Sequence, residues 1–206
     1  MSDCFALLDE PRRPWLDVES LKQKFLARSA AAHPDRFHSA SPMEQEEAAA
    51  RYSELNTAYN RLRDPRERLA HLIELELGRR PENIQAVPGG AMNQVLEVGQ
   101  VCREADQFIA ARALITSPLL KVEAFSRGMA IAERVTALQQ TLSQDQSTFD
   151  TALRSLNDAW HSAPPVGSPD RAVHLPLDRL GELFRSISYT GRCRAQLQER
   201  FVQLAM

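Results

Sequence analysis

The tripeptide His33-Pro34-Asp35 places an imidazole and a carboxylate on either side of a proline. A histidine and an aspartate can transfer protons in a catalytic site, but such a site needs a pocket and a third group that orients the base. No nucleophile in a recognisable motif lies near these residues. The tripeptide equally suits a loop that presents polar groups to a partner, or a corner between two helices in which Asp35 caps the second.

The segments on both sides of this tripeptide have the pattern of helices. Before it, Val18, Leu21 and Phe25 mark one apolar face of a helix that Asp17 caps and that ends near Ala32, because Pro34 disfavours helical geometry in the residue before it. After it, Pro42 suits the first position of a second helix. The apolar residues of this second helix recur at spacings of three and four: Ala48, Tyr52, Leu55, Tyr59 and Leu62.

Shorter helices are predicted at either end of this pair. A leading helix has Phe5, Leu7 and Leu8 as its core side chains. Asp64-Pro65 reads as the cap and first turn of a further helix, which Gly78 ends. Residues 78–90 hold two prolines and three glycines, and this composition predicts a linker.

The rest of the chain has helical periodicity and predicts an antiparallel bundle. One helix is expected over about 92–115 and the last one over about 177–204. Between them, residues 118–162 are apolar-periodic, and the sequence does not distinguish one long helix from two. Residues 163–173 are rich in proline and predict a loop.

Composition excludes several classes of function. The formal net charge of -2 gives no global attraction to nucleic acid, and no apolar run approaches the roughly 18 residues that span a bilayer. The acidic N-terminus lacks the features of a secretory signal, so we expect a cytoplasmic protein. Cys4, Cys102 and Cys193 form no Cys-x-x-Cys pair, and no glycine-rich phosphate loop occurs, so we expect no metal site and no cofactor.

A helix, the His33-Pro34-Asp35 loop and a second helix within the first 77 residues resemble a J domain, the module by which co-chaperones act on DnaK-class ATP-driven chaperones. Phe5, Pro11 and the segment from Asn56 to Pro65 resemble the HscB type, which serves iron–sulfur cluster assembly. The resemblance implies an all-α fold without enzymatic activity of its own. It comprises a J domain over 1–77, a linker over 78–90 and a client-binding helical domain over 91–206.

The resemblance also implies which residues contact the chaperone. His33, Pro34 and Asp35 would dock on the nucleotide-binding domain and interdomain linker of a DnaK/HscA-class chaperone and promote its ATP hydrolysis. Lys22, Lys24 and Arg28 are the basic residues that would steer the encounter, unless they are an ordinary solvated helix face. The family has an aromatic residue just before the histidine and basic residues close upstream, where this chain has three alanines at 30–32.

A second implied site binds the client, expected to be the iron–sulfur cluster scaffold protein. Met92, Leu96, Glu97 and Val98 stand where the C-terminal domain of the HscB type opens, although methionine and leucine at helical spacing also suit a bundle core. This chain differs at 98–101 and is longer around 110–138. A J protein with another client, and a helical scaffold with a degenerate J domain, therefore remain alternatives. The sequence leaves the oligomeric state open.

Overall fold

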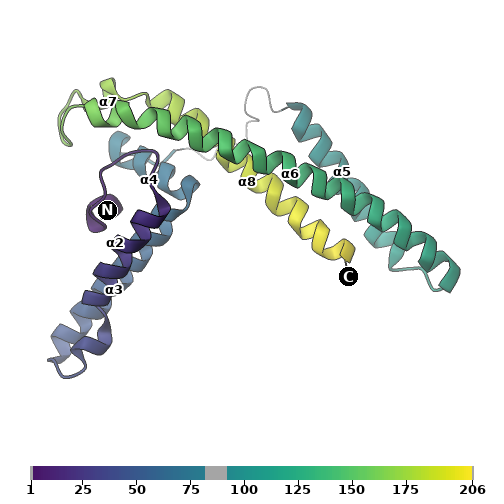
Figure 1. Cartoon of the computed structure of the whole chain (residues 1–206), viewed down its shortest axis with the longest axis horizontal. Coiled ribbons are helices and arrows are strands. Elements are labelled where there is room, and N and C mark those ends of the chain that lie inside the picture. Colours follow the sequence, from purple (N-terminus) through teal and green to yellow (C-terminus); the bar gives the residue numbers. More distant parts are fainter. Residues whose placement is uncertain (1, 82–91, 206) are drawn as a thin grey trace. The chain divides into compact units, whose positions relative to one another are not determined.

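The computed structural model of the protein describes residues 2–81 and 92–205, and within them all regular structure is helical, which confirms the predicted all-α class (Figure 1). Most of the predicted linker lies outside the described residues. The helices are α1 (Cys4–Leu7), α2 (Val18–Ala31), α3 (Pro42–Arg63), α4 (Pro65–Leu77), α5 (Met92–Arg112), α6 (Pro118–Ser162), α7 (Arg171–His174) and α8 (Leu177–Ala205), with a 3-10 helix, η1 (Pro34–Phe37), between α2 and α3.

The chain folds into two compact units that do not follow its order. Unit 1 combines Met1–Glu82 with Thr151–Phe184, and unit 2 combines Asn83–Asp150 with Arg185–Met206. Helices α6 and α8 each contribute to both units. Domain boundaries at 77 and 91, drawn from composition, stay a prediction.

Side-chain caps define the helices that surround the tripeptide. The Asp17 carboxylate accepts hydrogen bonds from the backbone of Glu19 and Ser20 at the start of α2. Ser41 caps α3 in a capping box with Glu44, and Asp64 accepts from the Glu67 backbone at the start of α4. Gly78 ends α4 at φ +70°, a left-handed conformation that favours glycine. The predicted caps at Asp17 and Asp64 are confirmed.

Helices α2 and α3 pack against each other as a hairpin. Phe25 and Tyr59 stack with ring centroids 4.4 Å apart, and the side chains of Leu21 and Leu55 are buried. Of the three core side chains predicted for the leading segment, Phe5 in α1 and Leu8 directly after it are buried, whereas Leu7 is only half-buried. The hairpin therefore has its own apolar interior, which holds the tripeptide at the point where α2 gives way to α3.

His71 in α4 is a buried imidazole that receives a hydrogen bond from the backbone N–H of Cys4 at its Nε2, 3.1 Å away. Burial, and then the positive charge of Arg61, lower the pKa of His71 below its usual 6.5. The unfolded chain therefore binds more protons than the folded one below about pH 6.5. The contribution of His71 to stability is fully present above that pH and is lost as the pH falls toward the lowered pKa.

We expect this pH dependence to be measurable. Between about pH 6.5 and the folded pKa, urea unfolding should give a free energy that falls by up to about 1.4 kcal/mol per pH unit. The variant His71→Phe should flatten this slope, whereas His161→Gln, at an exposed position, should keep it. An unchanged slope in His71→Phe would show that another group causes the dependence.

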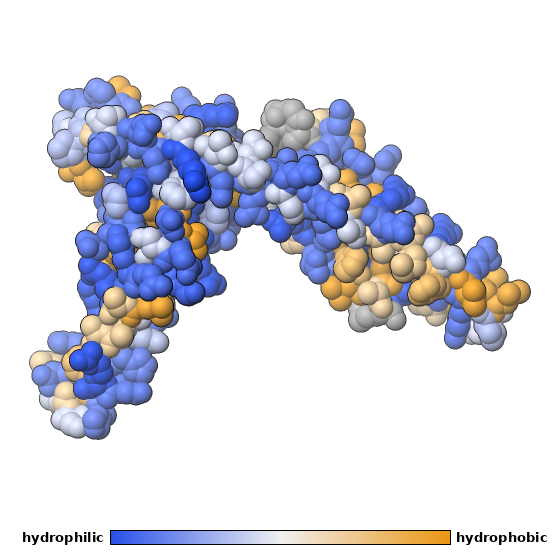
Figure 2. Space-filling view, viewed as in Figure 1, coloured by the Kyte–Doolittle hydropathy of each residue, from blue (hydrophilic) through white to orange (hydrophobic). Residues whose placement is uncertain are grey.

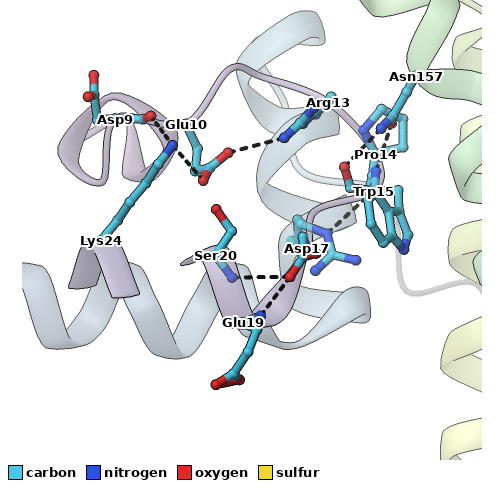
Figure 3. Close-up of polar contacts among 11 residues, drawn as sticks. Asp9, Glu10, Arg13, Pro14, Trp15, Asp17, Glu19, Ser20, Lys24 and Asn157 are labelled. Carbon is cyan, nitrogen blue, oxygen red and sulfur yellow. Dashed lines mark hydrogen bonds and ion pairs between the residues drawn. The ribbon is translucent and has the colours of Figure 1, made fainter. Parts of the chain in front are cut away.

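Residues 151–184 pack against the N-terminal helices through polar as well as apolar contacts. The Asn157 side chain in α6 accepts a hydrogen bond from the backbone N–H of Trp15 and donates one to its carbonyl, each at 3.0 Å (Figure 3). The Arg154 guanidinium lies 4.0 Å from the centroid of the Trp15 ring. The segment before α2 is thus held at both its backbone and its side chain.

Unit 2 is a bundle of α5, α6 up to residue 150 and α8 from residue 185. Its buried cluster includes Val101, Ile131, Leu142 and Leu197. At Gly128 a Cβ atom would lie 3.1 Å from the Phe108 ring, so glycine allows α5 and α6 to approach closely. Residues 118–162 form one helix, which decides the alternative that the sequence left open.

Hydrophobic surface gathers at the end of unit 2 where α6 begins (Figure 2). The apolar periodicity of this helix includes four residues of which 48% or more is exposed: Leu119, Val122, Phe125 and Met129.

None of the helices in the described residues combines the length and the apolar character that crossing a membrane requires.

Candidate functional site

The tripeptide lies in a loop whose backbone is fastened by local hydrogen bonds. The His33 imidazole is the N-cap of η1, because its Nδ1 accepts from the backbone N–H of Asp35 at 3.3 Å. In a neutral imidazole this leaves Nε2 protonated and able to donate. The ring also packs edge-on against Tyr52, with centroids 5.2 Å apart. His33 therefore has a fixed orientation before any partner arrives.

Asp35 presents its carboxylate to solvent. Its side chain is 89% exposed and lies 3.5 Å from Nδ1 of His33. Its backbone carbonyl accepts a hydrogen bond from Nδ1 of His38 at 2.9 Å, and Arg36 reaches back to the carbonyl of Ala30. In the alternative interpretation, Asp35 would cap the second helix; this is not the case, because His33 caps η1 and Ser41 caps α3.

The three basic residues predicted on α2 all have acidic neighbours. Lys24 pairs with Glu10 at 2.8 Å and donates to the carbonyl of Asp9 (Figure 3). Arg28 lies 3.7 Å from Asp9, and Lys22 lies 3.6 Å from Glu19.

These pairs differ in strength. The Glu10 carboxylate is 2% exposed and also contacts Arg13, so Lys24 fastens α2 to the preceding loop. The Asp9 and Glu19 carboxylates are largely exposed, and such pairs contribute about 0–1 kcal/mol. Lys22 and Arg28 can therefore exchange their partners for acidic groups of another protein more readily than Lys24 can.

Three of the four residues predicted to bind the client lie on the surface of α5. Met92 and Leu96 are more than half exposed, and Glu97 is exposed as well. Val98 is 2% exposed and belongs to the core of unit 2, because it lies on the face of α5 that packs against α6 and α8. Its side chain supports the helix, so the candidate client surface reduces to Met92, Leu96 and Glu97.

The three cysteines are free and buried. Burial raises the pKa of the Cys4 and Cys102 thiols above the usual value. Within the described part of the chain, no group of three or more His, Cys, Asp or Glu side chains could hold a metal ion.

Two grooves were not predicted from the sequence. One of about 550 Å³ lies between the end of α2 and the start of α3, beside the tripeptide. The other, of about 680 Å³, lies in unit 2 and includes Phe125, Met129 and Phe201 in its lining. The alanines at 31 and 32 were a sequence signal for the first groove, since small side chains beside a loop leave space.

Comparisons with known proteins find relatives among co-chaperones. The chain is 42% identical over 74 residues to the co-chaperone protein HscB homolog of Neisseria meningitidis, which is 36% of this chain and 45% of that protein. It is 39% identical over 72 residues to the HscB homolog of Bordetella petrii, 35% of this chain and 42% of that protein. The match spans less than half the length of these curated relatives. No family model matches the chain.

The fold resembles that of a solved structure over nearly the whole chain. The crystal structure of human co-chaperone protein HscB has a TM-score of 0.61 and 16% sequence identity, and the match covers 97% of this chain and 82% of that one. At this identity the likeness shows the fold alone. Together with the sequence matches, it confirms the predicted resemblance to HscB-type co-chaperones.

Proposed function

We propose that this protein is a J-domain co-chaperone of the HscB type. Its His33-Pro34-Asp35 loop engages a DnaK/HscA-class chaperone and accelerates ATP hydrolysis by that chaperone. Its unit 2 delivers a client, the iron–sulfur cluster scaffold protein. The protein itself carries out no catalysis in this scheme.

One observation carries the proposal: local contacts fix the His33 ring, while the Asp35 carboxylate is exposed to solvent. His33 is fixed by its bond to the Asp35 backbone and by Tyr52, while the Asp35 carboxylate is 89% exposed. Preorganised groups lose little conformational entropy on docking, and an exposed carboxylate can accept charge-assisted hydrogen bonds from an arginine of the partner. His33 and Asp35 line neither of the two grooves described above, whereas a catalytic base would need an enclosing pocket.

We expect Asp35→Asn to lower the stimulation of single-turnover ATP hydrolysis by tenfold or more, because the amide cannot form the charge-assisted bond. Thermal unfolding of the variant should match that of the wild type, since the exposed carboxylate stabilises little. Asp158→Asn, at an exposed position in α6, is the matched control and should stimulate normally. Full stimulation by Asp35→Asn would remove this residue from the proposed contact.

The client arm of the proposal rests on Met92, Leu96 and Glu97, which place two apolar side chains and a carboxylate together on exposed α5. Leu96→Ala should weaken binding to the scaffold protein in calorimetric titration. Leu114→Ala is the matched control, because Leu114 is an exposed leucine of the same unit outside α5 and outside the residues from Leu119 to Met129. If the wild-type protein does not bind the scaffold at all, the iron–sulfur cluster scaffold protein is not its client.

A different client is the second candidate. The exposed apolar residues from Leu119 to Met129 favour it, because they lie in the region where this chain is longer than the family it resembles. Normal stimulation of the chaperone by a wild-type protein that does not bind the scaffold would favour this second candidate.

A further inference from the structure

The groove beside the tripeptide has an apolar floor. We call it the alanine groove and define it by Ala31 and Ala32 at the end of α2, Phe37 in η1, and Ala48 and Leu55 in α3. Its volume is about 550 Å³, within the range of about 300–1,000 Å³ of ligand pockets in proteins. Ala48 and Leu55 are buried beneath it, so the floor is continuous with the interior of the hairpin.

The groove is continuous with the surface of the tripeptide. Ala32 directly precedes His33, and Phe37 ends the 3-10 helix that begins at Pro34. A partner that docks on the loop would therefore also cover the groove. The groove is hollow at this end because Ala31 and Ala32 have the smallest side chains that a helix former can have.

Charges at the sides of the groove indicate the chemistry of its occupant. Arg28 lines it from α2 and Arg51 lines it from α3. Their acidic partners, Asp9 at 3.7 Å and Glu54 at 3.9 Å, have side chains that are 79% and 52% exposed, so these pairs hold the guanidinium groups weakly. Glu44 and Glu47 also line the groove; Ser41 holds the Glu44 side chain, and Glu47 is exposed on the same helix. The two arginines extend from the other sides of the groove and can turn to a carboxylate of the partner.

We propose that the alanine groove receives a bulky apolar side chain of the chaperone, namely leucine, methionine or phenylalanine, with an acidic residue next to it. The inference rests on the proposed function, since it requires that the chaperone docks on the loop. The apolar side chain of the partner fills the space between Ala31, Ala32 and Leu55. Ala31 and Ala32 thus determine which chaperone fits.

Filling the groove tests the inference. In Ala31→Phe and Ala32→Phe the added ring occupies the groove, and we expect the Kd for the DnaK-class chaperone of the same organism to rise about tenfold or more, which corresponds to about 1.4 kcal/mol. Ala30→Phe is the matched control, because Ala30 is exposed in the same helix and does not line the groove. Circular dichroism of all three variants checks that the hairpin remains folded.

Separate outcomes distinguish this inference from the proposed function. Weak binding by the two groove variants with normal binding by Ala30→Phe supports it. If both groove variants bind as well as the wild type, or more tightly, the groove is not an acceptor site, while stimulation by the wild type still supports the co-chaperone function. If the wild type neither binds nor stimulates the chaperone, both proposals fail.

A second measurement tests the acidic neighbour. Arg51→Ala should raise the Kd at 50 mM salt and reduce the salt dependence of binding, because one screened charge pair is lost. An unchanged salt dependence would exclude a carboxylate at this position of the partner.

Discussion

Replacing Arg68 with alanine is expected to lower the free energy of unfolding by about 3–5 kcal/mol. Arg68 is 2% exposed, and its guanidinium donates from Nε to the carbonyl of Pro14 at 2.9 Å and from an Nη to the carbonyl of Leu62 at 2.7 Å. Hydrogen bonds to charged groups contribute about 1.5–3 kcal/mol each, and the substitution leaves both carbonyls without this donor. Urea unfolding followed by circular dichroism measures the loss.

The two carbonyls lie at positions that shape the hairpin. Pro14 belongs to the segment before α2, and Leu62 lies near the end of α3. The control is Arg179→Ala, whose side chain is 58% exposed and which should change stability by no more than about 0.5 kcal/mol. A loss below about 1 kcal/mol for Arg68→Ala would mean that other groups or water replace the guanidinium.

Replacing Arg171 with methionine is expected to cost about 3–5 kcal/mol as well, because it leaves the Glu76 carboxylate buried without its cation. The two side chains are 8% and 3% exposed and form two hydrogen bonds, at 2.9 Å and 3.1 Å. A third bond joins the Arg171 guanidinium to the carbonyl of Pro164. The contact joins α4 to α7 within unit 1.

The double variant Arg171→Met with Glu76→Leu separates the penalty of a lone buried charge from the worth of the pair. A buried pair replaced by apolar side chains is often neutral, so the double variant should recover most of the stability that Arg171→Met loses. Equal losses in the single and double variants would show that the bond to Pro164, and not the ion pair, stabilises this contact.

Local signals in the sequence were sufficient to predict the helices around the tripeptide. Asp17 and Asp64 cap the helices that follow them, and Pro42 begins α3, because capping depends only on residues within the first turn. The exposure of the Asp35 carboxylate also depends on local structure, because Asp35 lies in a four-residue 3-10 helix.

Contacts between distant segments could not be predicted in this way. Lys24 was predicted to steer a partner, but it pairs with Glu10, which the preceding loop brings beside α2. Asn157 and Trp15 are 142 residues apart in the chain, and no sequence pattern relates them. The same limit applies to residues 151–184, which pack with the N-terminal helices although no local pattern in the sequence relates the two segments.

Periodicity identifies an apolar face but not what covers it. Val122, Phe125 and Met129 follow the helical pattern of a core and are exposed in the structure, whereas Val98 was predicted at a surface and lies in the core. The continuity of α6 was undecided for a similar reason. Its polar stretch around Ser143 contains no proline or glycine. Polar residues alone do not interrupt a helix when the apolar residues on both sides of them are packed.

Single-turnover ATP hydrolysis by the DnaK-class chaperone of the same organism tests the central claim most directly. We predict that the wild-type protein accelerates hydrolysis and that the acceleration by His33→Gln is at least tenfold smaller. The variant His161→Gln, which replaces an exposed histidine outside the loop, should accelerate hydrolysis as the wild type does. His33 fixes the loop through its bond to the Asp35 backbone, and glutamine cannot reproduce both that bond and the packing on Tyr52. No acceleration by the wild type, or equal acceleration by His33→Gln, would contradict the co-chaperone account.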